Sequence, residues 1–268
     1  MDFKKDIFPY LQEIRRRVFR IVIAIGVITG FLLGCHLNPI DVYGITLYYP
    51  TLEPLHNVAA QITNHMRGNL VPDSVQLIQT APGQAFFSQV YIAALVGIVA
   101  SIPIIIREFV GFLKPALKDN EIKVGRSITA PAVGLFITGC IFAYIFVVPF
   151  ILDFLYKYGE SAGLITFLNI LDFVSFVLQF LLAFGLSFQL PLIMYALSAS
   201  GMVDYKFWRT NMRYAVIGIV IFGAVITPDG SGVTMWFIGG PMLVLYFAGM
   251  FVIERRGRRK AKIVVKKT

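Results

Sequence analysis

A charged segment, Arg107 to Glu121 (REFVGFLKPALKDNE), lies between two long apolar runs and carries the residue types of a peptide-docking site. Its carboxylates include Glu108 and Glu121, and Phe112 lies between them. A carboxylate can accept two hydrogen bonds from the planar fork of a guanidinium group, a geometry that Lys does not reproduce. The segment therefore predicts a site for a basic and apolar peptide. The alternative is that these carboxylates form surface ion pairs with nearby Lys and Arg, each worth about 0–1 kcal/mol.

The polar N-terminal segment supplies further charges that could face the same peptide. Apolar residues recur there at roughly helical spacing: Phe8, Leu11, Ile14 and Val18. Residues 9–17 are therefore predicted to form an amphipathic helix at a membrane interface. Glu13 and Arg15 lie within this helix, and Glu13 offers another carboxylate for a guanidinium group.

Gln189 is a polar residue inside an apolar run, AFGLSFQLPL. A polar side chain in lipid is costly unless it meets a partner, commonly on another helix. Two interpretations are equally open from the sequence. Gln189 could make an internal hydrogen bond that fixes packing, or it could contact a helix from another subunit. Ser187 and Pro191 flank it and would free backbone groups for hydrogen bonding.

The sequence shows no pattern typical of an enzyme, a metal site or a cofactor site. The histidines all lie in or beside one loop, and the cysteines form neither a CxxC pair nor a disulfide framework: His36, His56, His65, Cys35 and Cys140. GxSxG, HExxH and P-loop spacings do not occur. We expect free thiols, surface histidines and no covalent catalysis.

Composition indicates an all-α integral membrane protein. The chain has 268 residues, of which 57% are hydrophobic and only 15% charged, too apolar for a soluble domain of this length. The net charge of +9 does not indicate nucleic-acid binding, because Lys and Arg cluster at the ends of apolar runs and not on a soluble face.

Hydropathy predicts six transmembrane helices. We expect a cytoplasmic N-terminal segment at 1–17, a transmembrane domain at 18–253 and a basic cytoplasmic tail at 254–268. The expected spans are about 18–34, 85–106, 128–155, 171–197, 214–226 and 233–253, with an outer loop at 35–80 that contains a surface helix at 54–66.

The fifth span is expected to be unusually short, and the sixth is also expected to be short. Thirteen residues, 214–226, rise about 20 Å at about 1.5 Å each, against a hydrocarbon core of about 30 Å. Such a helix should thin the surrounding bilayer or be shielded by neighbouring protein.

The positions of Lys and Arg predict that both termini are cytoplasmic. All but two of the 24 Lys and Arg lie on one side of the predicted spans, and only Arg67 and Lys157 lie on the other. Short cytoplasmic loops carry the excess of basic residues in membrane proteins. Six spans with this bias place the N- and C-termini on the same, cytoplasmic side.

Several stretches, in order along the chain, resemble the TatC family, the receptor and core subunit of the twin-arginine protein translocase. These stretches are YLQEIRRRVF (10–19), TAPGQAFF (80–87), FLKPALKDNE (112–121), GCIFAYIFVVPF (139–150), AFGLSFQLP (183–191) and ITPD (226–229). The resemblance covers about residues 5–253. It implies recognition of paired arginines in the signal peptides of folded cargo, followed by transport driven by the proton-motive force.

The resemblance also implies roles for individual residues and partners. Signal-peptide-binding positions fall on Glu121, Phe112, Glu13 and Arg15; Glu108, where the chain departs from the family pattern, is expected to add an acidic contact. Positions that contact partner helices fall on Gln189, Thr227 and Pro228. The implied partners are single-span TatA and TatB subunits, other copies of the chain and the bilayer of a prokaryotic cell membrane.

The chain departs from the family pattern in two places. Arg107 to Val110 replaces a frequent Tyr-Gln-x-Trp, which alters the aromatic wall of the peptide site, and the turn TPDG has one Pro where TPPD is frequent. The alternative function is a six-span small-molecule secondary transporter, which needs a polar site at the middle of the membrane. Only Gln179 and Gln189 offer such polarity. An intramembrane enzyme would need a nucleophile–base pair or a metal cluster.

Overall fold

The structure is a computed structural model that describes residues 3–42, 45–72, 75–113, 119–164, 166–201, 203–204, 206–227 and 232–265. The described side chains exclude those of residues 3–11, 42, 45–47, 109–113, 119–129, 200, 256 and 258–265. The chain divides into two compact units, each treated separately below. The first contains Met1–Phe112 and Val148–Leu178, and the second contains Leu113–Val147 and Gln179–Thr268.

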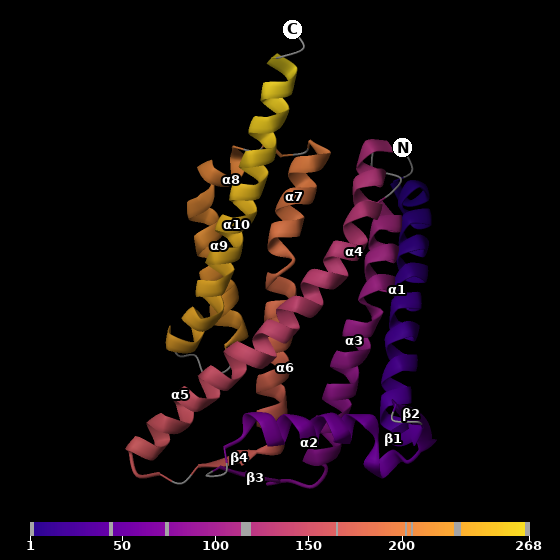
Figure 1. Ribbon diagram of the computed structural model, residues 1–268. Helices are drawn as coiled ribbons and strands as arrows, with labels where there is room; N and C mark the ends of the chain where they lie inside the picture. Colours follow the sequence, from indigo (N-terminus) through magenta and orange to yellow (C-terminus); the bar gives the residue numbers. More distant parts are fainter. Residues whose placement is uncertain are drawn as a thin grey trace. The chain divides into compact units, whose positions relative to one another are not determined.

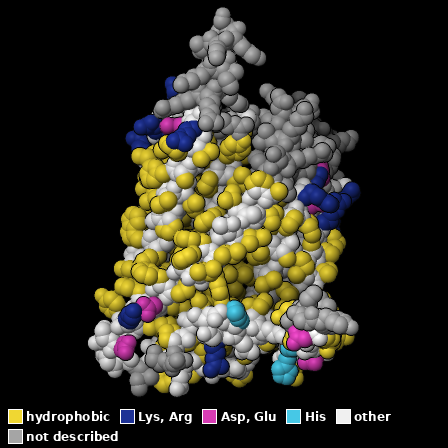
Figure 2. Space-filling view, in the orientation of Figure 1, with side chains coloured by type: hydrophobic (Ala, Val, Ile, Leu, Met, Phe, Trp, Pro, Cys, Tyr) yellow, Lys and Arg dark blue, Asp and Glu magenta, His cyan; other side chains and the backbone are white. Residues whose placement is uncertain are grey.

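Long apolar helices dominate both units (Figure 1). Within the described residues, five segments are long and apolar enough to cross a membrane: Gln12–Gly34, Gln84–Glu108, Ala130–Ser161, Ile170–Ala199 and Gly232–Arg255. Met212–Ile226 is a shorter apolar helix. Figure 2 shows hydrophobic side chains along the middle of the helices in view, with Lys and Arg near their ends. The chain is a multi-pass membrane protein.

The first unit is built on the packing of α1 (Phe3–Gly34) against α3 (Gln84–Leu113). A Cβ atom on Gly97 of α3 would lie 2.6 Å from Thr29 Oγ1 and 3.2 Å from the Ile25 carbonyl oxygen of α1. Thr29 Oγ1 also donates a hydrogen bond to the Ala93 carbonyl oxygen at 3.4 Å. Small residues allow such close approach between membrane helices.

The predicted N-terminal helix and first span form the single helix α1, so the expected boundary at residues 17 and 18 lies inside it. The boundary at residues 253 and 254 lies inside α10 (Gly232–Val265) in the same way.

The first loop contains a β-hairpin that the sequence did not predict. Strands β1 (Cys35–Val42) and β2 (Ile45–Leu52) pair antiparallel. A short strand β3 (Gln76–Ile78) pairs in parallel with β4 (Phe167–Asn169), which follows α5 (Val148–Ser161). The all-α expectation thus omitted two small sheets. The β3–β4 pair joins the first loop to the loop before α6 (Ile170–Ser187), so these two loops lie at the same end of the spans.

The surface helix begins four residues later than expected. A 3₁₀ turn, η1 (Pro54–His56), precedes α2 (Val58–Leu70). Asn57 caps α2 because its Oδ1 accepts a hydrogen bond from the Ala60 amide at 2.8 Å. Val58, Ala59 and Met66 of α2 are buried, whereas Leu55, which the predicted helix included, lies outside α2 and is 85% exposed.

Two of the expected spans contain irregular segments beside a proline. The third expected span is α4 (Asp119–Phe142), the π-helical segment η3 (Ala143–Val147) and α5, with Pro149 just after η3. The fourth is α6 and α7 (Leu190–Ser200), with Pro191 just after the break. A proline lacks an amide hydrogen and its ring clashes with the carbonyl four residues earlier, which favours such breaks. The helices run unbroken through Pro131 and Pro241.

The second unit packs α4 closely against α6. A Cβ atom on Gly139 would lie 2.5 Å from the Phe184 carbonyl oxygen, and one on Gly185 would lie 2.6 Å from the Phe136 ring. Helices α7 and α10 also meet closely, because a Cβ atom on Gly249 would lie 3.1 Å from Pro191 Cα.

The two expected short spans have different outcomes. After the short helix α8 (Phe207–Thr210), α9 (Met212–Ile226) has 15 residues, so the expectation of a short fifth helix is confirmed. The sixth apolar segment, Gly232–Arg255, has 24 residues, so its predicted shortness was wrong. It is long because α10 continues as a helix into the basic tail.

Candidate functional site

A cluster of carboxylates and guanidinium groups lies where α1 meets α3 in the first unit. Glu13 Oε1 accepts hydrogen bonds from Arg17 Nε at 3.0 Å and from Arg17 Nη2 at 2.5 Å. Glu108 Oε2 accepts one from Arg17 Nη1 at 3.0 Å. Two carboxylates, one from each helix, therefore hold a single guanidinium group. This brings together Glu13 and Glu108, two of the residues predicted to bind a peptide.

Glu108 is the buried member of the cluster, with only 3% of its surface exposed. Arg20 Nη1 lies 3.3 Å from Glu108 Oε1, and Arg107 Nη2 lies 3.5 Å from the same oxygen. Buried carboxylates require partners, because removing an unpaired charge from water is costly. Glu108 meets this requirement with arginines of its own chain, in ion pairs whose carboxylate is buried and not at the surface as the alternative expected.

Arg15 and Glu13 line different hollows on α1. A polar hollow of about 310 Å³ is lined by Gln12, Glu13, Arg16, Arg17 and Arg20. A second hollow of about 310 Å³ is lined by Gln12, Arg15, Arg16 and Phe19. Residues two apart on a helix do not share a face, which explains this separation. The structure therefore does not bring Arg15 to the side of α1 on which Glu13 and Glu108 meet.

The side chains of Glu121 and Phe112 lie outside the described residues. Their backbones are described: Phe112 is near the end of α3, and Glu121 lies in the first turn of α4. The other predicted residues of the peptide site are described in full.

Gln189 lies at the break between α6 and α7. Its Nε2 donates a hydrogen bond to the Ala132 carbonyl oxygen of α4 at 3.0 Å and approaches the Gly185 carbonyl oxygen at 3.5 Å. The side chain thus makes the internal hydrogen bond of the first interpretation, and it is half-buried. The described contacts do not test the second interpretation, contact with a helix from another subunit.

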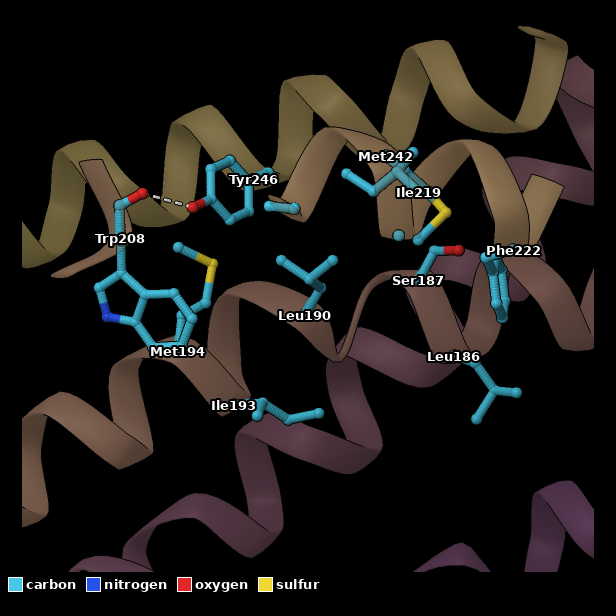
Figure 3. Close-up of a pocket in the computed structure, with 12 residues that line it drawn as sticks. Leu186, Ser187, Leu190, Ile193, Met194, Trp208, Ile219, Phe222, Met242 and Tyr246 are labelled. Carbon is cyan, nitrogen blue, oxygen red and sulfur yellow. Dashed lines mark hydrogen bonds between the residues drawn. The ribbon is translucent and has the colours of Figure 1, made fainter. Parts of the chain in front are cut away.

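An apolar cavity of about 400 Å³ lies among α6, α7, α9 and α10 of the second unit (Figure 3). Its lining includes Leu190, Trp208 and Phe222. At one end Tyr246 donates a hydrogen bond from its hydroxyl to the Trp208 carbonyl oxygen at 2.6 Å, drawn as a dashed line in Figure 3. The cavity has a mostly apolar lining without charged side chains, so it is not suited to bind a small polar solute for transport.

Thr227 is buried at the end of α9, where its hydroxyl donates to the Gly223 carbonyl oxygen at 3.1 Å. The Thr227 backbone amide donates to the same oxygen at 3.1 Å, so backbone and side chain together close this end of α9. Pro228, the next predicted contact, lies outside the described residues.

The loop histidines have contacts with neighbouring loop residues. His36 Nδ1 is hydrogen-bonded to the His56 carbonyl oxygen, and the His65 ring to Asn69. Among the described residues, no group of three His, Cys, Asp or Glu is placed to hold a metal ion. Cys35 and Cys140 are free thiols, as expected.

Comparison with known proteins identifies the family. The family model described as Sec-independent protein translocase protein (TatC) matches residues 9–241. A Sec-independent protein translocase protein TatC from Cenarchaeum symbiosum is 67% identical over 94% of this chain and 95% of its own length. The chain belongs to the TatC family. Its function therefore lies in protein translocation, and the small-molecule transporter alternative is not supported.

Other TatC proteins show how widely the likeness extends. A chloroplastic TATC from Pisum sativum is 30% identical over 96% of this chain, which spans 66% of that relative. The crystal structure of a twin arginine translocase receptor TatC superposes with a TM-score of 0.73 at 24% identity, covering 91% of this chain and 98% of that one. The two proteins share the TatC fold.

Arg17 and Arg20 were not predicted from the sequence to belong to the cluster of charged groups where α1 meets α3. The spacing of Glu13 and Arg17, four residues apart on a predicted helix, was an available signal for one ion pair. The contact between Arg17 and Glu108 joins residues 91 positions apart, and no local pattern reveals it.

Proposed function

We propose that this TatC-family protein is a receptor for signal peptides that carry paired arginines, and the core subunit of a translocase for folded proteins. The observation that supports the proposal best is the arrangement of Glu13 and Glu108 around the guanidinium group of Arg17. This end of α1 and α3 already has carboxylates spaced to accept from all three nitrogens of one guanidinium group. A peptide arginine presents the same group.

We propose that Glu121 receives an arginine of the peptide, with Phe112 contacting its apolar part, Glu13 and Glu108 completing the site, and Arg15 contacting the peptide from the adjacent hollow on α1. Glu121 lies in the first turn of α4. A Glu121→Ala variant should lose at least tenfold in affinity for a twin-arginine peptide, because a charge-assisted hydrogen bond to guanidinium contributes about 1.5–3 kcal/mol.

The test is a binding titration with the detergent-solubilised protein. Glu160→Ala is the matched control, since Glu160 is an exposed acid near the end of α5 and belongs to no proposed site. Unchanged affinity in Glu121→Ala, or an equal loss in both variants, would remove Glu121 from the site.

We propose that single-span TatA- and TatB-type subunits contact the region of Gln189, Thr227 and Pro228, and that copies of the chain assemble with them in the membrane. The apolar cavity beside α7 and α9 supports this, because it offers an uncovered apolar surface near the α6–α7 break that holds Gln189.

We propose a six-span topology in a prokaryotic cytoplasmic membrane, with α9 as the fifth span and both termini in the cytoplasm. The clustering of Lys and Arg at one end of the expected spans supports it, as does the β3–β4 pair, because these strands follow α2 and α5, the helices that carry Arg67 and Lys157. Labelling of single cysteines introduced at each terminus tests it; reaction of either terminus with an impermeant reagent in intact cells would contradict it.

A further inference from the structure

The β1–β2 hairpin has an apolar side beside the end of the first span. Antiparallel pairing sets Cys35 opposite Leu52, Leu37 opposite Pro50 and Pro39 opposite Tyr48. Alternate residues of a strand point to opposite faces, so these pairs share one side of the hairpin. Leu52 is 86% exposed and Tyr48 is 66% exposed, although both are large and apolar.

The other side of the hairpin is polar near α2 and is held by the protein. Asn38 Nδ2 donates to Thr51 Oγ1 at 2.8 Å across the two strands. Gln61 of α2 donates from Nε2 to the Leu37 carbonyl oxygen at 3.0 Å and lies 3.3 Å from His36 Nε2. These contacts hold the hairpin against α2, while Tyr48 and Leu52 of the apolar side remain exposed.

The hairpin continues directly from α1, which puts its apolar side beside the end of the first apolar segment. Cys35 follows Gly34, the last residue of the span, and the Glu53 amide donates to the Gly34 carbonyl oxygen at 3.1 Å. Leu52 is therefore fixed beside the end of a helix that crosses the membrane. Leu55, three residues further along, is also 85% exposed.

The hairpin has the other features of an interfacial element. The ladder pairs the backbone groups that face the partner strand, and the outward-facing groups can bond to water at the surface of the bilayer. Tyr is enriched where the membrane meets water, because its ring is apolar and its hydroxyl polar. Asp41 lies near the far end of the hairpin and is exposed, as expected for a tip that rises into water.

We propose that the β1–β2 hairpin lies on the bilayer, with Tyr48, Leu52 and Leu55 inserted among the lipids of the leaflet at the C-terminal end of α1. This gives the first loop a membrane-anchoring role that is separate from peptide recognition. The continuity with α1 favours lipid over a protein partner.

The proposal is tested with spin labels on the full chain in phosphatidylcholine vesicles. Single cysteines replace Leu52 on the apolar side and Thr51 on the polar side, in a background with Cys35→Ala and Cys140→Ala. Oxygen concentrates in the bilayer and a charged nickel chelate stays in water. The ratio of oxygen to nickel accessibility should be several-fold higher for Leu52→Cys than for Thr51→Cys, and Asp41→Cys should resemble the latter.

Equal ratios at positions 51 and 52 would overturn the proposal, because the apolar side would then face water. A label at position 52 shielded from both reagents would overturn it too, by showing that protein covers this side. If loss of Cys35 disturbs the hairpin, the same contrast is measured with both cysteines present, by quenching of Leu52→Trp and Thr51→Trp with brominated phosphatidylcholine. Stronger quenching of Leu52→Trp than of Thr51→Trp supports the proposal, and equal quenching contradicts it.

Discussion

At the scale of single residues, the chain uses its own arginine where a peptide arginine is proposed to bind. Arg17 spans Glu13 on its own helix and Glu108 on α3. The two carboxylates are not equivalent. Glu13 is about one-third exposed and lies one helical turn from Arg17, whereas Glu108 is buried and contacts arginines at three positions. Glu108 therefore holds α1 against α3, while Glu13 is the more available of the two to an incoming peptide.

Glu108→Ala should destabilise the protein more than Glu13→Ala. Losing a buried carboxylate that accepts from charged donors should lower the free energy of unfolding by about 1–3 kcal/mol. Losing one partner of an i, i+4 surface pair should lower it by about 0.3–0.5 kcal/mol. Thermal unfolding of the two variants in detergent measures the difference, and a Glu13→Ala variant that unfolds at the lower temperature would show that the buried contact is unimportant.

Gln189 is proposed to serve partner assembly in addition to the hydrogen bond that it makes with Ala132. Gln189→Leu should therefore weaken co-purification of the single-span subunits more than it weakens binding of a signal peptide. The reason is that a leucine offers no donor to a neighbouring helix, while the peptide cluster involves other residues. If co-purification is unaffected, the internal hydrogen bond is the whole role of Gln189.

At the scale of elements, close crossings at glycines set the packing of the helices. On α4, Gly139 faces the Phe184 carbonyl oxygen of α6, and backbone cannot move aside as a flexible side chain can. Gly134, on the same helix, has no atom within 4 Å of the position where a Cβ atom would lie. The two glycines thus form a matched pair for testing the α4–α6 crossing.

Gly139→Ala should lower the free energy of unfolding by about 1–3 kcal/mol, the usual cost of overpacking. Gly134→Ala should leave stability unchanged or raise it by up to about 1 kcal/mol, because Ala favours the helix. Unfolding followed by circular dichroism compares the two. Equal stability of both variants would mean that α4 and α6 do not cross as closely as the structure has them.

The long helices were predictable from sequence because sustained apolar runs have few other solutions in a membrane. The hairpin was not, because Pro39 and Pro50 interrupt the strand pattern. Both prolines are tolerated since each strand of a two-stranded sheet is an edge strand. The β3–β4 pair was hidden for another reason: its partners are three residues long and far apart in sequence, so no periodicity marks them.

The candidate site was predictable in part for similar reasons. Charged residue types beside apolar runs pointed to Glu13 and Glu108. The sequence could not show that Arg17 and Arg20 already engage Glu108, because that depends on how α1 and α3 meet.

At the scale of the whole molecule, the chain combines long apolar segments with one apolar helix, α9, that is too short to cross an unperturbed bilayer. Its 15 residues rise about 22 Å against a hydrocarbon core of about 30 Å. Thinned lipid beside α9 is therefore still expected. Locally thin membrane is compatible with the translocase function proposed above.

The central claim, that this TatC-family protein recognises paired arginines, is tested most directly by one binding comparison. The affinity of the solubilised protein is measured for a signal peptide carrying Arg-Arg and for the same peptide carrying Lys-Lys. We predict a preference of at least tenfold for Arg-Arg, because only guanidinium groups can bind carboxylates in bidentate fashion. Equal binding of the two peptides would contradict the claim. It would mean that the carboxylates form only ion pairs within the chain.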